Sequence, residues 1–436
     1  MISTHQQKSS AVRRVATLLI ALSLCACTVE EPERVAPEQE STPAKRASSG
    51  RWAEVQTNRD NADLTDEQRA EIEQLEALGY VDGKIDAPDL IGVTRHDAEQ
   101  TFGDYNLLTS AHSASAQLID MQGKVLHEWG YPFSEVWPDY PNQNQLSTFW
   151  RRTHLFENGD LLAIYEGLGI IKVDKDSNLL WKSGVRAHHA MQVMPDGSIY
   201  ILSRRADILP RINEDKAVLE DFITVLGANG KPQRSISLLV AMENSEFTHM
   251  WDGSRNWDGD LFHTNSLEVL DGSLADVNPA FAEGNILVSM LLPSLVAVLD
   301  PEAEKFVWVE PGPYKYQHDP RVLANGTVMI FDNQGAGEET SRVMEMDPKT
   351  WEPVWDFTGS AKQPFYSETC GLAQRLPNGN TLITESDRGR AFEITRQGGM
   401  VWEFYNPSRA GDENQYIATM MEMYRLPEDF PLDWLE

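Results

Sequence analysis

The sequence of 436 residues carries 67 acidic and 37 basic side chains, which gives a formal net charge of −30. This balance excludes a typical nucleic-acid-binding protein, because lysine and arginine are needed to hold phosphate backbones. We attribute the charge to solubility rather than to recognition of a substrate. Because one repeat array fills most of the chain, we expect one large domain behind a short N-terminal region.

The N-terminus has the order of a secretory signal. Lysine and arginine residues precede an apolar run from Val15 to Ala26, which is too short to span a bilayer stably. The run ends in Leu-Cys-Ala-Cys, which resembles a bacterial lipobox with Cys27 as the lipid acceptor, although Cys25 is a less usual residue there. We predict a lipoprotein signal peptide over residues 1–26, with an ordinary secretory signal cut nearby as the alternative.

The signal predicts a protein that faces the periplasm or the cell exterior and is held at the membrane by a lipid on Cys27. Thr28 after the acceptor, rather than Asp, favours the outer membrane if the cell has one. Residues 27–62 begin with a stretch rich in Glu, Pro and Ser and show no apolar period. We therefore expect a disordered tether over this range.

Residues 63–90 are expected to form a short helix and a lead-in to the main domain. Thr65 and Gln68 fit a capping box at the start of the helix. Ile72, Leu75 and Leu78 are predicted to lie on one apolar face of the helix, and Gly79 is predicted to end it. We expect this helix to pack on the rim of the domain that follows.

From residue 91 onward one pattern recurs: an apolar run, a turn with glycine, a second run, a further turn and a closing strand. Turns such as Asn-Gly between β-rich runs indicate hairpins, because they need positive φ. Copies of the pattern begin at Arg151, His188, Phe262, Gln317 and Cys370. Most of them close with a strand that carries a tryptophan: Trp181, Trp308, Trp355 and Trp402. Repeats of about 40 to 50 residues with four strands each predict propeller blades.

The first copy, Asn106 to Gly130, supplies only the later three strands of the pattern. The missing piece is found at the C-terminus, where MYRLPED from Met423 echoes AQRLPNG from Ala373. We infer that the C-terminal strand completes the first blade and closes the ring, which also removes free sheet edges. The prediction for residues 91–436 is an all-β, six-bladed β-propeller closed by the C-terminal strand.

Three histidines lie near the start of the first strand in successive copies. His189, His263 and His318 precede an inward-packing residue of their strands by 5, 7 and 5 positions. These separations are odd, so on a strand of period two the three imidazoles are predicted to share one face near the axis. His188 has the opposite parity and is predicted to turn towards a neighbouring blade, whereas His154 lies deeper in its strand.

Several interpretations of the three histidines remain open. They can be hydrogen-bonded structural residues, a metal site with an open position, or a metal-free site in which imidazole acts as nucleophile and as acid or base. If Cys25 is removed and Cys27 is lipidated, Cys370 is left as the one free thiol, so no internal disulfide is expected.

The motifs around these histidines resemble the bacterial arylsulfotransferase (aryl-sulfate sulfotransferase) family. They are GVTRHD at Gly92, HTNSLEVL at His263, QHDPRVLANG at Gln317, FDNQG at Phe331 and CGLAQRLPNGNTLITES at Cys370. The resemblance implies a six-bladed propeller that moves a sulfuryl group between phenols through a sulfated histidine. It also implies that neither a metal nor another cofactor takes part.

Carried over by motif, the resemblance makes His318 the nucleophile, and His263 and His189 the residues that hold the sulfuryl oxygens and manage the phenol proton. The family has an arginine seven residues after the turn glycine of the His263 copy, but here that position is Leu291. The same count in the preceding copy ends at Arg204, which we predict to present its guanidinium to the same cavity; a surface arginine is the alternative.

The sequence therefore predicts an arylsulfotransferase-like enzyme acting on small phenols and aryl sulfates, anchored to a membrane and with no nucleic-acid partner. Because Leu291 replaces the family arginine, a catalytically inactive propeller that binds a ligand or a protein is a second hypothesis. A metal-dependent hydrolase or lyase on the histidine cluster is a third.

Overall fold

The structure is a computed structural model that describes residues 64–76, 81–141, 148–251 and 259–435. All of these residues belong to one compact unit that covers residues 51–436. The predicted signal peptide, Cys27 and the tether lie outside the described residues, as do Leu78 and Gly79. Within the described ranges, no helix is both long enough and apolar enough to cross a membrane.

Helix α1 (Asp66–Glu76) begins at the predicted capping box. The backbone N–H of Gln68 donates to Oγ1 of Thr65 at 3.1 Å, and the N–H of Thr65 donates to Oε1 of Gln68 at 3.0 Å. The apolar face of the helix, Ile72 and Leu75, packs on the long strands β11 and β12. The predicted short N-terminal helix and its start are therefore confirmed.

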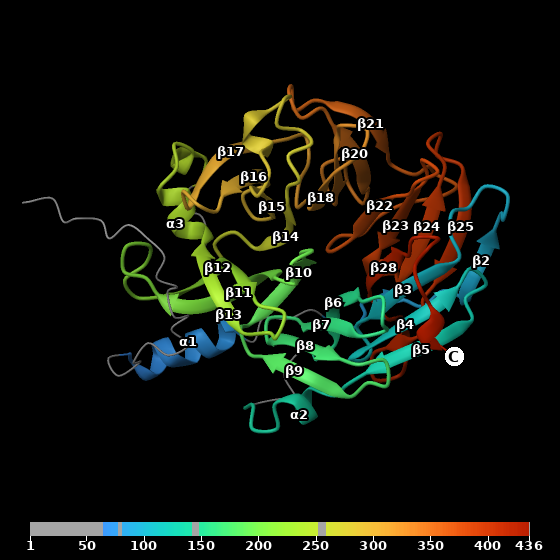
Figure 1. Cartoon of the computed structure of the whole chain (residues 1–436), viewed down its shortest axis with the longest axis horizontal. Helices are drawn as coiled ribbons and strands as arrows, with labels where there is room; N and C mark the ends of the chain where they lie inside the picture. Colours follow the sequence, from blue (N-terminus) through green and yellow to red (C-terminus); the bar gives the residue numbers. More distant parts are fainter. Residues whose placement is uncertain (1–63, 77–80, 142–147, 252–258, 436) are drawn as a thin grey trace, which may run out of the picture. The chain divides into compact units, whose positions relative to one another are not determined.

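The described residues fold mainly into antiparallel sheets with few helices (Figure 1). Six sheets have four or five strands each. The first three consist of β28 (Met420–Arg425), β3 (Tyr105–Ser110), β4 (Ser115–Asp120) and β5 (Val125–Gly130); β6 (Trp150–Leu155), β7 (Leu161–Tyr165), β8 (Gly169–Val173) and β9 (Leu179–Ser183); and β10 (Ala187–Val193), β11 (Ile199–Ile208), β12 (Ala217–Leu226) and β13 (Pro232–Ser237).

The other three sheets follow in chain order. They consist of β14 (Thr264–Val269), β15 (Ile286–Met290), β16 (Leu295–Asp300) and β17 (Lys305–Pro311); β18 (His318–Val322), β19 (Val328–Asp332), β20 (Arg342–Met346) and β21 (Pro353–Phe357); and β22 (Leu372–Arg375), β23 (Thr381–Glu385), β24 (Arg390–Ile394), β25 (Met400–Tyr405) and β2 (Gly92–His96). The remaining elements are α2 (Phe133–Val136), α3 (Leu238–Glu243), the 3₁₀ turns η3 (Thr248–Met250), η5 (Pro279–Phe281), η6 (Ser386–Arg388) and η7 (Asp433–Leu435), and a small sheet of β1 (Ile85–Asp86), β26 (Arg409–Ala410) and β27 (Tyr416–Ile417).

The strands fall where the repeated pattern predicted them, and β28 pairs with β3, which is the pairing that the C-terminal sequence echo predicted. The pattern did not predict β2, which adds a fifth strand by pairing with β25. The edge of β25 would otherwise expose unpaired backbone groups, and β2 covers it.

The first strands of the six sheets contact one another in order (Figure 1), from β28 through β6, β10, β14, β18 and β22 back to β28. At most of these junctions a Gln or Glu side chain binds the backbone of the next strand. Oε1 of Gln192 accepts from the N–H of Val269 at 2.7 Å, and Oε2 of Glu422 accepts from the N–H of Thr153 at 2.8 Å. Glu268 and Gln374 make the same kind of contact with Val322 and Arg425.

The C-terminal segment is also held by packing. Trp434 in η7 lies with its ring centroid 5.5 Å from that of Trp129, and it covers the turn at Gly159. A Cβ at Gly159 would lie 2.7 Å from Trp434, and φ there is +84°, so this turn requires glycine.

Arg425 on β28 forms a fully buried ion pair that links three parts of the chain. Its Nη1 lies 3.0 Å from Oε2 of Glu393, and its Nε donates to Oδ1 of Asn106 at 2.7 Å. Both charged side chains have an exposed fraction of 0%. Losing one member of such a pair leaves an uncompensated buried charge.

We expect Arg425→Met to lower the free energy of unfolding by about 3–5 kcal/mol, because Glu393 would stay buried without its partner. Denaturant unfolding measures this change. Arg211→Met is the matched control: its pair with Glu243 at 2.9 Å is partly exposed on both sides, so the expected loss is below about 1 kcal/mol. Equal losses in the two variants would contradict the role given to Arg425.

Candidate functional site

The first strands of several sheets are irregular near their start, at the level of the predicted histidines. Register shifts interrupt β6, β10, β14, β18 and β28 at this level. His189 and His263 have φ of 50° and 49°, in the left-handed region. A bulge re-aims side chains, so the strict alternation behind the predicted shared face does not hold here. The rings of His189 and His263 still meet, with centroids 5.1 Å apart.

The prediction that His188 turns towards a neighbouring sheet is wrong. Its Nδ1 lies 2.9 Å from Nδ1 of His189, and its Nε2 lies 3.5 Å from Oδ1 of Asp221 in the same sheet. The left-handed backbone at His189 breaks the alternation, so both imidazoles of the pair enter one buried cluster.

His318 is held through one ring nitrogen. Its Nδ1–H donates to Oδ1 of Asn333 at 2.8 Å and lies 3.1 Å from the carbonyl oxygen of Tyr316. The amide nitrogen of Asn333 donates to the carbonyl oxygens of Ser367 at 2.9 Å and Cys370 at 2.7 Å. These two carbonyls fix which way the amide points, so Nδ1 of His318 carries the proton. Nε2 then bears the lone pair.

Nε2 of His318 is buried and has no hydrogen-bond partner among the described residues. Burial, together with the positive charge of Arg151, lowers the pKa of His318 to about 3. The imidazole is therefore neutral at physiological pH. A neutral ring with a fixed Nδ1–H and an available Nε2 lone pair is the form that acts as a nucleophile.

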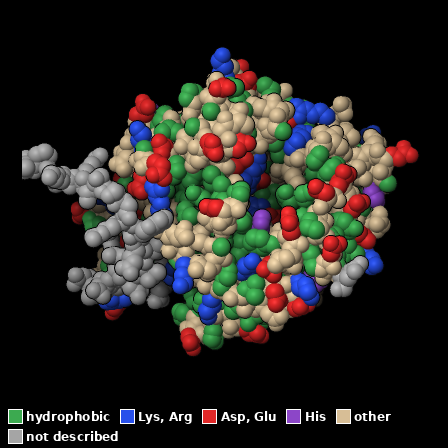
Figure 2. All heavy atoms as spheres, viewed as in Figure 1, with side chains coloured by type: hydrophobic (Ala, Val, Ile, Leu, Met, Phe, Trp, Pro, Cys, Tyr) green, Lys and Arg blue, Asp and Glu red, His purple; other side chains and the backbone are tan. Residues whose placement is uncertain are grey.

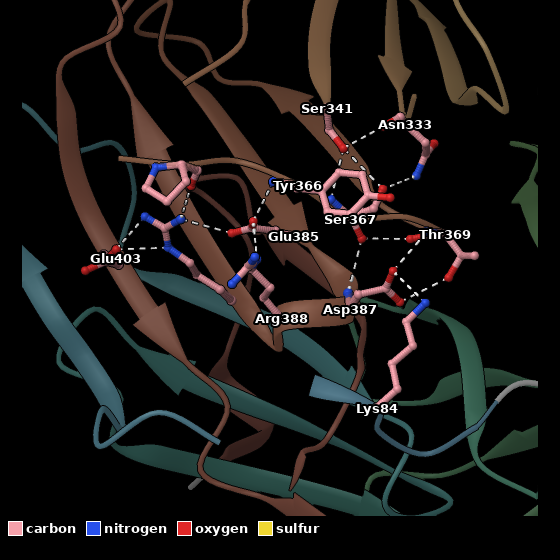
Figure 3. A network of polar contacts seen from close by, with 12 residues as sticks. Lys84, Asn333, Ser341, Tyr366, Ser367, Thr369, Glu385, Asp387, Arg388 and Glu403 are labelled. Carbon is pink, nitrogen blue, oxygen red and sulfur yellow. Dashed lines mark hydrogen bonds and ion pairs between the residues drawn. The ribbon is translucent and has the colours of Figure 1, made fainter. Parts of the chain in front are cut away.

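The residues that orient Asn333 belong to a larger network, shown in Figure 3. Oγ of Ser367 binds the carbonyl oxygen of Thr369, and the N–H of Asp387 lies 3.1 Å from the same hydroxyl. Asp387 in turn accepts from the N–H and the hydroxyl of Thr369 and pairs with Lys84 at 3.2 Å. These bonds hold the loop from Ser367 to Cys370, whose carbonyl oxygens accept from Asn333.

His263 has a different environment. Its Nδ1–H donates to Oδ2 of Asp260 at 2.6 Å, and its backbone N–H donates to Oδ1 of the same residue at 3.0 Å. Asp221 accepts from the next backbone N–H, that of Thr264, at 2.7 Å. Burial alone would lower the pKa of His263, but Asp260 and then Asp221 outweigh it, so this pKa is raised above 6.5.

The exposed fraction of the His263 side chain is 24%, against 1% for His189, so the cluster opens to solvent on the His263 side. Figure 2 shows a histidine beside basic side chains in a hollow near the middle of one face. Burial and the neighbouring cations lower the pKa values of His188 and His189 well below 6.5. Imidazoles that are held neutral and one that favours protonation therefore lie in a single site.

Arg204 and Leu291 occupy equivalent register positions in neighbouring sheets: Arg204 lies within β11, and Leu291 directly follows β15. The N–H of Arg204 donates to the carbonyl of Arg186 at 3.2 Å, and the N–H of Leu291 donates to that of His263 at 3.3 Å. Arg204 is buried, with 6% exposed, so the alternative of a surface arginine is wrong. Its guanidinium lies over the turn at Gly167, where a Cβ would come within 2.1 Å of it.

Sequence reasoning missed Arg151 and Asn333. Arg151 is buried and lies eight residues before the turn glycine Gly159; His189 and His318 lie at the same distance from Gly197 and Gly326. That spacing could have revealed it. Asn333 directly follows β19 and lies seven residues after the turn glycine Gly326, the same count that leads to Arg204 and Leu291, so this spacing could have revealed it as well.

Glu166, His188 and His189 are the one group in the described chain with three possible metal-donor atoms, all within 4.8 Å. The same carboxylate faces two guanidinium groups, however: Nε of Arg151 at 3.5 Å and Nη1 of Arg204 at 3.9 Å. These charges would repel a cation and attract an anion. The arrangement therefore favours a site for a negatively charged group, and we assign no metal to it.

A separate cavity of about 530 Å³ is lined mainly by residues of the inner strands β6, β10, β18, β22 and β28. His154 lines it, whereas His189, His263 and His318 do not. Burial lowers the pKa of His154 to about 4, so this imidazole is neutral. Its place agrees with the prediction that His154 lies deeper in its strand.

Residues 152–407 match the model of the arylsulfotransferase (ASST) family. No curated protein matches the chain.

Solved structures with low similarity include a protein of unknown function from Bacteroides caccae, with 14% identity and a TM-score of 0.43 over 73% of this chain and 98% of that one. The β-propeller domain of Cps50 (Swd1) from Myceliophteria thermophila has 11% identity and a TM-score of 0.42 over 77% and 98%. Hydrazine synthase from Kuenenia stuttgartiensis has 11% identity and a TM-score of 0.42 over 73% and 81%.

Because the pKa of His263 is raised, we expect its imidazolium to persist above pH 6.5 and to be lost as the pH rises through the higher folded value. Asp260→Asn should lower the midpoint, since burial remains while the carboxylate with the larger effect is removed. An NMR titration of the imidazole C–H signals measures both midpoints. An unchanged midpoint in Asp260→Asn would contradict this assignment; the His318 signal, which should stay constant from pH 5 to 8, is the internal control.

Proposed function

The chain belongs to the arylsulfotransferase family, and from this premise we propose that it transfers a sulfuryl group from an aryl sulfate to a phenol through a sulfated His318. Membership supports a sulfotransferase-like enzyme. The observation that carries the finer proposal is the state of His318, whose Nδ1–H is held by Asn333 while the Nε2 lone pair has no partner among the described residues.

In the first half-reaction, the Nε2 lone pair of His318 attacks the sulfur of the aryl sulfate. The N–S bond forms as the bond between sulfur and the aryl oxygen breaks, and the electron pair leaves with that oxygen. His263 donates a proton to the leaving oxygen, because its pKa is raised by Asp260 and it is the more exposed imidazole. The products are a phenol and N-sulfated His318.

In the second half-reaction, a phenol enters and its hydroxyl gives a proton to the now neutral His263. The phenol oxygen attacks sulfur, the N–S bond breaks, and the electron pair returns to Nε2 of His318. The proton lost in the first step is thus recovered in the second. Sulfuryl transfer resembles phosphoryl transfer, so the protein contributes mainly positioning and charge stabilisation.

In this proposal the three sulfuryl oxygens lie between the imidazoles and a guanidinium. His189 helps to hold them, since its ring is 5.1 Å from that of His263. Arg204 replaces the arginine that the family has at Leu291, from the equivalent register position of the neighbouring sheet. The contacts of Arg204 with Glu166 and Gly167 support a position beside the histidine cluster.

We also propose that the six large sheets are the blades of one closed propeller over residues 91–436. The ordered contacts among the first strands and the pairing of β28 with β3 support closure. In such a ring the starts of these strands converge near the axis, which accounts for histidines from three sheets meeting in one site.

Leu291 supports a second candidate, a propeller that binds a ligand at the histidine cluster without catalysis, because leucine cannot neutralise a sulfuryl group. A metal-dependent hydrolase is the third candidate. Assays of sulfuryl transfer distinguish the transferase from the binding propeller. Metal analysis of the purified protein distinguishes the metal-dependent hydrolase from both.

We expect incubation with p-nitrophenyl sulfate and no acceptor to add one sulfuryl group, about 80 Da, to His318, because a covalent intermediate accumulates when the second substrate is withheld. Intact mass and peptide mapping detect the adduct. His318→Ala should eliminate both the adduct and the transfer to phenol. Arg204→Ala should lower transfer on the order of 10²-fold, as expected for an oxyanion donor.

His154→Ala is a control, because His154 lines the other cavity; it should keep the adduct. If wild-type protein forms neither adduct nor product with several phenols, the transferase proposal is wrong and the binding propeller is favoured. If Arg204→Ala alone has no effect, only the assignment of Arg204 is lost.

We propose, finally, that the protein is anchored by a lipid on Cys27 and faces the periplasm or the exterior, at the outer membrane if the cell has one, since Thr28 follows the acceptor. Cys27→Ala should release the chain from membranes or leave it unprocessed. Fractionation and N-terminal mass analysis measure this. A mature wild-type chain that starts at a residue other than Cys27 would refute the anchor.

A further inference from the structure

Arg151 is a buried cation beside the histidine cluster for which the proposed reaction has no role yet. It lies at the register shift of β6, between Trp150 and Arg152, where a bulge re-aims the side chain. Its exposed fraction is 3%. Its Nη1 lies 3.2 Å from Sδ of Met421, the residue at the corresponding shift of β28.

Arg151 shares one carboxylate with Arg204. Nε of Arg151 lies 3.5 Å from Oε2 of Glu166, and Nη1 of Arg204 lies 3.9 Å from Oε1. Glu166 also contacts His189. The backbone N–H of His189 donates to Oε2 of Glu166 at 3.2 Å, and Nδ1 of His189 lies 3.3 Å from Oε1 of Glu166. All four side chains are buried.

Glu166 is the carboxylate that both guanidinium groups share. Two guanidinium groups face a single carboxylate, and the low pKa values of His188 and His189 leave these imidazoles neutral. Asp221 and Asp260 bind the backbone and ring of the His263 segment, and the charge of Arg204 also helps to lower the pKa of Asp260. Two buried guanidinium groups that share the carboxylate of Glu166 form a place that favours an anion.

We propose that Arg151 and Arg204 together bind a tetrahedral oxyanion, either free sulfate or the sulfuryl group of the substrate, with Arg151 supplying charge that Leu291 cannot supply. Arginine suits this ligand, because its planar donor set binds oxyanions with two parallel hydrogen bonds. The identification with the sulfuryl group rests on the proposed function; the binding of an oxyanion does not.

The carboxylate of Glu166 competes with this anion for the guanidinium groups of Arg151 and Arg204. Without a ligand, its carboxylate offsets the two guanidinium groups. An incoming oxyanion repels it and competes for the same donors. Removal of its charge should therefore strengthen anion binding, whereas an ordinary structural ion pair would give no such gain.

The test is calorimetric titration of the full chain with inorganic sulfate at constant ionic strength, with chloride as the balancing anion. We expect Arg151→Gln to weaken sulfate binding about 10-fold or more, in line with the loss of a charged donor, and Glu166→Gln to strengthen it. Arg375→Gln is the matched control: Arg375 lies on the inner strand β22 and pairs with the buried carboxylate of Glu345, although its own side chain is only partly buried. It should leave sulfate affinity unchanged.

Arg151→Gln leaves Glu166 without one partner and can destabilise the fold, so the double variant Arg151→Gln/Glu166→Gln is measured as well. The double variant removes one buried positive charge and one buried negative charge together. Thermal melting shows whether it is folded. It should bind sulfate more weakly than Glu166→Gln alone. If sulfate binds equally to these two proteins, or if wild-type protein binds no sulfate, the oxyanion site is refuted.

The outcomes for this site and for the transferase are distinguishable. Sulfate binding that depends on Arg151, in a protein that transfers no sulfuryl group, would keep the site and remove the transferase. Transfer that is as fast in folded Arg151→Gln as in wild type would keep the transferase and remove Arg151 from it.

Discussion

The orientation of one buried amide, that of Asn333, determines what His318 can do. Its nitrogen is committed to the carbonyls of Ser367 and Cys370, so its oxygen must accept from Nδ1 of the imidazole. A buried amide placed the other way would lose three hydrogen bonds and set like dipoles against each other, which is costly in a low dielectric. The lone pair of His318 is consequently on Nε2, and Arg151 and His263 lie near enough for their charges to lower the pKa of this ring.

The residues around the histidine cluster hold neutral and charged side chains close to one another. Burial keeps His318 neutral, whereas Asp260 favours a proton on His263, so nucleophile and acid differ by environment although both are imidazoles. Beside Glu166, the guanidinium groups of Arg151 and Arg204 provide a place for a negatively charged group. Buried groups of this kind cost stability, and side-chain bonds between successive inner strands, such as that of Gln192 with Val269, help to hold them in place.

The sequence predicted the strands well because turns at positions such as Gly159 and Gly326 need positive φ, which glycine adopts without strain. It also predicted the pairing of β28 with β3. It could not predict the left-handed backbone at His189, because no local signal marks a bulge at a non-glycine residue. The parity of His188 was misjudged for that reason. The role of Asn333 could not be predicted, because it depends on a loop far along the chain.

The most direct test of the account is the protonation state of His318, read from two-bond nitrogen–proton correlations of the imidazole in the ¹⁵N-labelled, unliganded protein. The account predicts a neutral ring from pH 5 to 8, with the proton on Nδ1 and an unprotonated Nε2. A ring with its proton on Nε2, or an imidazolium at neutral pH, would contradict the assignment of His318 as the nucleophile.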